Sequence, residues 1–310
     1  MILLACVAYP IVRVAADASE QSETVGTKDK FWYEGRGKLF KLVHGAGEDW
    51  AEKVCAEVAR TLGLPHAEYD LAIWDAGDKL GVASSNFCIP NGELILGNEL
   101  LSEVYPDYET PGVSRFRQSA HTVGRVLDVL KKYEPATPLG WAAPAWAGDA
   151  LGTFVGYLLL DALVGNTDRH HENWGFVRTR DGLLRLAPTF DHASSLGCHI
   201  LDSERGARLK SKDKNYDVAA YAAKARSALY ADEHDGKPLK TLDAFVSVAQ
   251  RAPVAGRGWI QRLEDVPFGD LAILIDNVPR ERITEPSAEF AQQVMAANLQ
   301  RIITARGTLP

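Results

Sequence analysis

Two polar clusters, separated by a short apolar stretch, hold the residues best suited to chemistry. The first spans residues 166–175 and the second spans residues 188–197. Residues 176–186 between them read as two strands joined by an Asp181-Gly182 turn, a strong local signal for a β-hairpin. A hairpin returns both clusters to the same end of a sheet. The oxygen-bearing side chains that we expect to converge there are Asp168, Asn173 and Asp191.

Carboxylate and amide oxygens on a rigid hairpin suit Mg²⁺, which binds through one or two carboxylates together with substrate phosphates. The spacing is also that of the phosphoryl-transfer site of protein kinases. In that pattern Asp168 is the base that faces the acceptor hydroxyl, and Asn173 and Asp191 hold the metal. His170 falls where other kinases carry a lysine near the transferred phosphate. Asp and Asn also favour turns for local reasons, but two clusters at this separation favour the kinase interpretation.

The same residues resemble a known family. The loop Asn166-Thr167-Asp168-Arg169-His170, closing on Asn173-Trp174-Gly175 and followed by Phe190–Gly197, is similar to the HipA-like serine/threonine kinases. These are bacterial proteins often found as toxins of toxin–antitoxin pairs. The resemblance extends from about Gly26 to the C-terminal helices. It implies ATP and Mg²⁺ as ligands, a protein substrate with a Ser or Thr acceptor, and an antitoxin-like regulatory partner.

A strand lysine and a helix glutamate are the next parts of a kinase site. Lys41 lies among apolar residues of a predicted strand, where a buried charge needs a partner, although a lysine on an exposed face fits equally well. The predicted helix 47–62 carries Glu52 and Glu57 on opposite edges of its apolar face, so periodicity leaves both open as the partner. The family resemblance implies Glu52, because of its distance from the Gly63-Leu64-Pro65 that ends the helix.

The nucleotide-binding end of the site is assigned mainly by the resemblance. Residues 26–30 alone favour an ordinary loop entering a strand. The resemblance implies a phosphate-binding loop containing Gly26, Thr27, Lys28 and Lys30. Ser85 and Phe87 stand where a kinase chain crosses between lobes and meets the adenine, although Phe87 also suits a core position. We therefore predict a lobe boundary between residues 88 and 89.

The expected fold class is α+β, a bilobal protein-kinase-like fold. The N-lobe (1–88) is small and β-rich with one helix, and the C-lobe (89–310) is larger and mainly helical. Strands are predicted within residues 1–10 and for residues 66–74, 79–86 and 93–97. Helices are predicted for residues 116–130, 149–164, 215–231, 239–251, 264–276 and 287–305. Asp161, the one charge near the end of an otherwise apolar helix, either braces the catalytic loop or faces water. The basic run 205–214 reads as an activation-like segment or, preferably, as a solvated loop.

The composition is that of a soluble globular protein. The chain has 310 residues, 46% hydrophobic and 24% charged, enough for a sizeable core. A net charge of −7 argues against direct nucleic-acid binding. Four scattered cysteines fit a reducing, cytoplasmic location. No apolar run is long enough to cross a membrane, so no membrane association is expected.

The chain departs from the longer HipA pattern because few residues precede Gly26, so an additional N-terminal subdomain is not expected. Two other classes of function fit the same residues. One is a kinase of a lipid or small-molecule hydroxyl, since the predicted site recognises the nucleotide and not the acceptor. The other is a non-catalytic nucleotide-binding module, which is less favoured because every base and metal position is filled.

Overall fold

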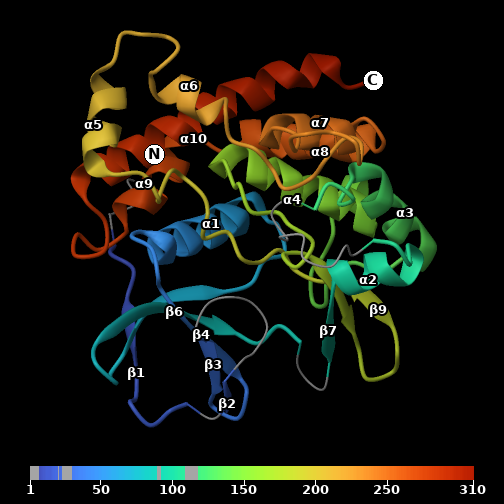
Figure 1. Cartoon of the computed structure of the whole chain (residues 1–310), viewed down its shortest axis with the longest axis horizontal. Helices are drawn as coiled ribbons and strands as arrows, with labels where there is room; N and C mark the ends of the chain where they lie inside the picture. Colours follow the sequence, from blue (N-terminus) through green and yellow to red (C-terminus); the bar gives the residue numbers. More distant parts are fainter. Residues whose placement is uncertain (1–6, 20, 23–29, 89–91, 109–117) are drawn as a thin grey trace.

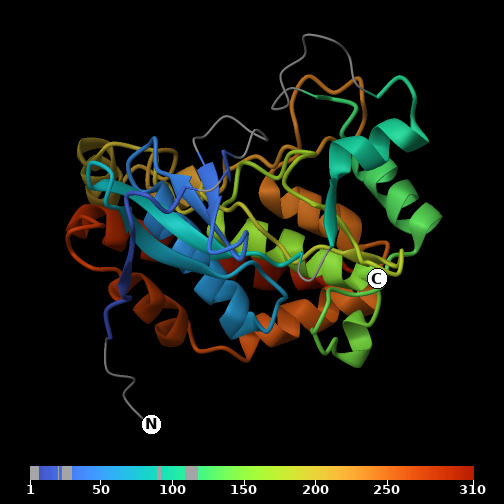
Figure 2. The ribbon, with the colours of Figure 1, turned by 90° about the horizontal axis from the view of Figure 1, so that it is seen from below.

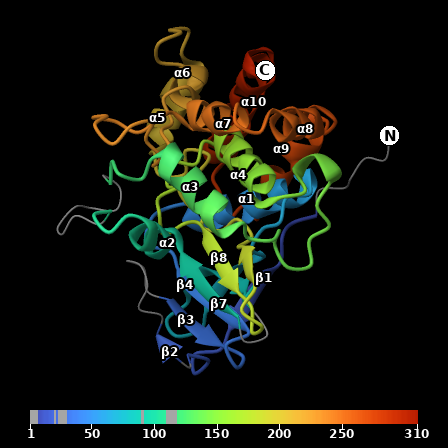
Figure 3. The same cartoon turned by 90° about the vertical axis from the view of Figure 1, so that its right-hand side faces the viewer.

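The computed structural model describes residues 7–19, 21–22, 30–88, 92–108 and 118–310. Within these ranges the strands and helices segregate, with most strands on one side of the molecule and helices α4–α10 on the other (Figures 1 and 3). Gly26, Thr27 and Lys28 of the predicted phosphate loop lie outside the described residues. No helix in the described part of the chain is long and apolar enough to span a membrane.

The N-terminal part is a mixed sheet covered by one helix. In the described residues its strand order is β1-β5-β6-β4-β3-β2, with β1 parallel to β5 and the other pairs antiparallel. The strands are β1 (Ile11–Val14), β2 (Gln21–Ser22), β3 (Lys30–Tyr33), β4 (Lys38–Leu42), β5 (Tyr69–Trp74) and β6 (Lys79–Ser85). A first strand was expected within residues 1–10. Residues 1–6 lie outside the described residues, residues 7–10 form no strand, and the first strand of the described residues begins at Ile11.

A second, antiparallel sheet contains the predicted hairpin. Its order is β7-β8-β9, with Phe176 opposite Leu186. The strands are β7 (Glu93–Leu96), β8 (Gly175–Arg178) and β9 (Leu184–Leu186). A Cβ atom on Gly175 would lie 2.2 Å from the carbonyl oxygen of Ile95, so only glycine allows β7 to approach this closely. The hairpin that brings the two polar clusters together is therefore confirmed.

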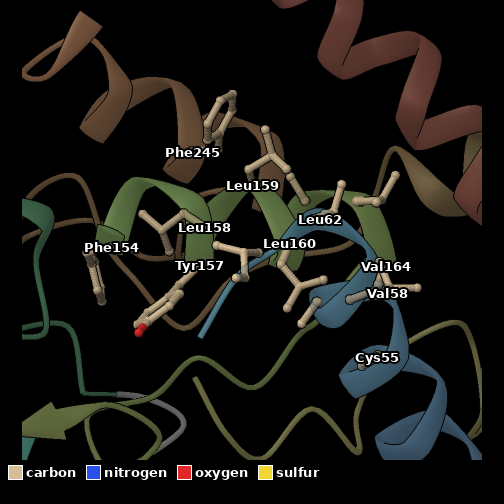
Figure 4. Close-up of a cluster of buried hydrophobic side chains, with 14 of the residues drawn as sticks. Cys55, Val58, Leu62, Phe154, Tyr157, Leu158, Leu159, Leu160, Val164 and Phe245 are labelled. Atoms are coloured by element: carbon tan, nitrogen blue, oxygen red, sulfur yellow. The ribbon is translucent and has the colours of Figure 1, made fainter. Parts of the chain in front are cut away.

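The larger part is built around α4 (Ala150–Val164), which is buried nearly all round. An apolar helix of this kind has to be enclosed by other helices. Figure 4 shows its side chains, from Phe154 to Val164, between those of α1 and Phe245 of α7. The other helices are α1 (Glu48–Leu62), α2 (Gly97–Val104), α3 (Val123–Tyr133), α5 (Asp202–Lys210), α6 (Val218–Ala222), α7 (Thr241–Ala249), α8 (Pro253–Glu264), α9 (Phe268–Asp276) and α10 (Glu285–Ala305).

Beyond residue 200, the assignment of helices from the sequence needs correction in three places. The basic run 205–214, for which a solvated loop was preferred, begins inside α5. The guanidinium of Arg205 in α5 is buried and donates to the backbone oxygens of Gly197 and Cys198, which satisfies the charge locally. Helix α8 was not predicted, and the helix expected over 215–231 is only the short α6. In α8, Gly256 and Gly258 interrupt the 3.6-residue apolar pattern.

Helix α1 is held between the large sheet and the C-terminal helices (Figures 1 and 2). At its start, the buried Arg282 guanidinium donates to the Asp49 carboxylate at 2.6 Å and to the backbone oxygen of Gly81 at 3.0 Å. At its end, Arg262 donates to the backbone oxygens of Thr61 and Leu62. Two arginines from the C-terminal part of the chain therefore fix both ends of α1.

Candidate active site

A single ammonium group joins the two parts of the molecule. Lys41 Nζ on β4 lies 3.3 Å from Glu52 Oε2 on α1 and 2.6 Å from Asp191 Oδ1 after the hairpin. Glu52 is 1% exposed, so its charge needs this partner. Glu57, the other glutamate that periodicity left open, pairs with Lys53 and Arg60 instead. The predicted contact between Lys41 and Glu52 is therefore confirmed.

The electrostatics of this group favour a permanently charged lysine. Burial alone lowers the pKa of Lys41, but the carboxylates of Asp191 and Glu52 outweigh it and raise the pKa above its ordinary value. Glu52 Oε1 also accepts a hydrogen bond from the backbone N–H of His192 at 2.7 Å. One glutamate thus fixes both the strand lysine and the chain immediately after Asp191.

The loop that carries Asp168 is built on a buried ion pair. Arg169 is fully buried, and its guanidinium donates to both oxygens of Asp161 on α4, at 2.7 and 2.8 Å. Asp161 also accepts from Asn166 Nδ2 at 2.8 Å. Arg169 further donates to the backbone oxygen of Asn173 at 2.6 Å. The alternative in which Asp161 braces the loop is therefore correct, and the one in which it faces water is wrong.

Arg169 also ties the first polar cluster to the second. Its guanidinium lies 2.9 Å from Thr189 Oγ1 and 3.0 Å from His192 Nε2. Because a guanidinium can only donate, a neutral imidazole suits this position, and Thr189 Oγ1 lies 2.9 Å from the same nitrogen. Burial, with a smaller contribution from Arg169, lowers the pKa of His192 to about 3. Sequence reasoning missed Arg169 and His192; the signal for the first was Asp161, a buried carboxylate that requires a nearby cation.

Within the loop, the hydrogen bonds orient the remaining polar groups. Asn173 Nδ2 donates to the backbone oxygen of Asp168 at 2.7 Å, which assigns the amide orientation and leaves its oxygen as an acceptor. His170 Nδ1 accepts from the backbone N–H of Glu172 at 3.1 Å. The other ring nitrogen, Nε2, therefore carries the proton and lies 3.6 Å from Asp168 Oδ1.

The residues predicted at the nucleotide-binding end are brought only partly together. Lys30 on β3 lies directly opposite Lys41 on β4, so both side chains are on the same face of the sheet. Ser85 ends β6. Phe87 stacks on Phe190, with ring centroids 5.7 Å apart, so it packs beside the residue that precedes Asp191.

The donor set agrees with Mg²⁺ held jointly with phosphate. No group of three or more His, Cys, Asp or Glu side chains in the described ranges is arranged to bind a metal. Asn173 and Asp191 would supply one amide oxygen and one carboxylate, which is the small protein share that Mg²⁺ takes when phosphates complete its shell. Asp191 has φ 58°, a left-handed conformation uncommon outside glycine, and such outliers cluster at functional sites.

Comparisons with known proteins support the fold. No protein-family model and no curated protein matches the sequence. Among solved structures, the chain is similar to the Helicobacter pylori proinflammatory kinase CtkA, with a TM-score of 0.72, 20% identity, and coverage of 95% of this chain and 97% of that chain. It is also similar to HipA of Shewanella oneidensis MR-1, solved with HipB and operator DNA, with a TM-score of 0.49, 13% identity, and coverage of 93% and 67%.

The chain therefore has a kinase fold, as the two polar clusters predicted. The α+β architecture is that of a small β-rich lobe with one helix and a larger, mainly helical lobe. The similarity to the CtkA structure shows this fold alone, and the resemblance to HipA-like kinases stays a prediction from the motifs. The boundary between residues 88 and 89 stays a prediction, as do the roles of the individual site residues.

Proposed function

We propose that the chain is a Mg-ATP-dependent protein serine/threonine kinase of the HipA-like type. The observation that supports this most is the position of Lys41. One ammonium group contacts a helix glutamate and an aspartate 150 residues away in sequence. A phosphotransferase needs a fixed cation at this junction, where lysine neutralises phosphate charge. An ion pair that only stabilised the fold would not require the hydrogen-bonded loop that carries Asp168 beside it.

In this proposal the described residues divide into three roles. Lys41, positioned by Glu52, contacts the nucleotide phosphates. Asn173 and Asp191 hold Mg²⁺, which when bound offsets the charge of the phosphate oxygens. Asp168 accepts the proton of the acceptor hydroxyl, whose oxygen bonds to the γ-phosphorus as the bond to the leaving ADP oxygen breaks. His170 Nε2 lies 3.6 Å from Asp168 Oδ1, and in this proposal it helps to place that carboxylate.

The remaining predicted residues complete the nucleotide site. Lys30 lies on the same sheet face as Lys41 and is placed to approach the phosphates. We propose that Gly26, Thr27 and Lys28 cover them, and that Ser85 and Phe87 border the adenine. An antitoxin-like partner and a role as a toxin belong to the same proposal. They follow from the resemblance to HipA-like kinases.

The metal assignment predicts a selective loss of Mg-dependent binding. Asp191→Asn tolerates the left-handed backbone but removes the charge, so the Kd of Mg-ATP should rise at least about tenfold. Asn173→Ala should raise it less, because it removes no charge. Isothermal titration calorimetry with and without Mg²⁺ measures both, and Asp181→Asn, in the exposed hairpin turn, is the matched control. Wild-type Mg-ATP affinity in both folded variants would exclude the hairpin as the metal site.

A further inference from the structure

A cavity of about 540 Å³ opens beside the catalytic loop. Its wall includes Gly165 and Thr167, so it begins at the residue bonded to Asp168, about 3.8 Å away along the chain. Thr167 donates from its backbone N–H and its hydroxyl to the backbone oxygen of Ser194, at 3.2 and 3.3 Å. The cavity therefore lies against both polar clusters, and its size is that of a ligand pocket.

The part of the lining that follows α6 is basic in an otherwise acidic chain. Lys224 and Arg226 line it, and no Asp or Glu is among the lining residues in the described structure. Each donates to a backbone carbonyl, Lys224 to Asn215 and Arg226 to Pro238. In the part of the chain that the structure describes, neither forms an ion pair with a carboxylate. Their charges are therefore available to an anionic ligand, although the net charge of the whole chain is −7.

We infer that this cavity binds an acidic side chain of the acceptor polypeptide, within a few residues of the Ser or Thr that is phosphorylated. The inference rests on the proposed function, because it requires the acceptor hydroxyl to lie at Asp168. An acceptor placed there extends its neighbouring residues past Thr167 into the cavity. A carboxylate then meets Lys224 and Arg226, whereas a basic residue is repelled, so attraction and repulsion both contribute to specificity.

The form of the wall favours a polypeptide as the occupant. Small and hydroxyl-bearing residues, including Ala225, Ser195 and Ser227, line the cavity beside the two cations. Such a wall leaves room for a main chain and offers it hydrogen-bond partners. The basic lining also opposes a cationic small-molecule acceptor.

The experiment is radiolabelled phosphoryl transfer to peptide libraries with a fixed Ser or Thr and varied flanking residues. The wild-type protein should select Asp or Glu at one or more flanking positions. Lys224→Glu and the double variant Lys224→Glu/Arg226→Glu should lower kcat/KM for the best acidic peptide by about tenfold or more and raise it for the matching basic peptide. Lys212→Glu, an exposed basic residue that does not line the cavity, is the matched control and should keep the wild-type preference.

If the substitutions only perturb the fold, transfer to every peptide should fall alike. Only a change of preference from acidic to basic peptides therefore supports the inference. Equal use of acidic, neutral and basic peptides by the wild-type protein overturns it and leaves the kinase proposal standing. Transfer to anionic lipid vesicles but to no peptide also overturns it. Absence of both transfer and Mg-ATP binding refutes the proposed function itself. Mg-ATP binding with no transfer to any peptide overturns the acidic-polypeptide assignment and the protein-kinase part of the proposed function, and leaves only nucleotide binding.

Discussion

Asp168→Asn should abolish most phosphoryl transfer while leaving Mg-ATP binding intact. The substitution keeps the shape of the side chain but removes the base, and loss of a general base costs about 10²–10⁴ in rate. An interaction made only in the transition state lowers turnover without weakening ground-state binding. The supporting contacts of the loop come from its backbone and from Asn166 and Asn173, so the fold should survive.

The measurement is transfer from radiolabelled ATP to protein or peptide, paired with calorimetric ATP binding on the same sample. If Asp168 only forms a turn, asparagine should replace it with little loss, because Asn is itself a good turn residue. Transfer at the wild-type rate in a folded Asp168→Asn protein would remove Asp168 from the mechanism and the kinase assignment with it.

The largest loss of stability is expected from Arg282→Met. Arg282 and Asp49 are both buried and 2.6 Å apart. Removing one member of a buried pair leaves the other charge without compensation, which costs about 3–5 kcal/mol. The carbonyl oxygens of Ala72 and Gly81 lose their donor as well. Urea denaturation should therefore show a much lower midpoint for this variant.

Arg280→Met is the matched control, since Arg280 is exposed two residues earlier and its replacement should change stability by no more than about 0.5 kcal/mol. Asp49 lies one helical turn before Glu52 on α1, so Arg282→Met should also weaken ATP binding through the contact between Glu52 and Lys41. Equal stability of the two methionine variants would show that the C-terminal segment does not fix α1.

Local sequence patterns were sufficient for the parts of the site that depend on short-range structure. The Asp181-Gly182 turn between two apolar runs predicted β8 and β9, and with them the approach of the second cluster to the first, where Arg169 contacts His192. The spacing of Asp168 and Asn173 likewise predicted a single loop, in which the two residues are hydrogen-bonded. These features follow from turn chemistry and alternating hydrophobicity, which are encoded over about ten residues.

Hydrophobic periodicity alone could not decide whether Glu52 or Glu57 contacts Lys41, and the family resemblance was needed to choose. Both glutamates border the apolar face of α1, and only the three-dimensional position of β4 distinguishes them. The family resemblance implied Glu52, and the structure brings Glu52 to Lys41. The roles of these residues in binding and transfer are still to be measured.

Buried cations were the features least accessible from the sequence. Arg169, Arg205 and Arg282 look like surface residues in a linear pattern, since most arginines are exposed. Their partners are carboxylates or carbonyl oxygens that become neighbours only after long-range packing, as Asp49 does for Arg282, 233 residues away. Long-range packing also explains why the prediction of a solvated loop at 205–214 is wrong. A basic run normally indicates exposure to solvent, but Arg205 in this run is buried.

The most direct test of the central claim is thermal unfolding of the wild-type protein with ATP and Mg²⁺, with ATP and EDTA, and without ligand. A ligand that binds only the folded state stabilises it by about 2.7 kcal/mol at a hundredfold excess over its Kd. A clear rise in Tm is expected with millimolar ATP and Mg²⁺, a smaller rise with EDTA, and a reduced rise in Lys41→Met, which lacks the cation joining Glu52 and Asp191. An unchanged Tm of the wild-type protein with Mg-ATP would contradict it.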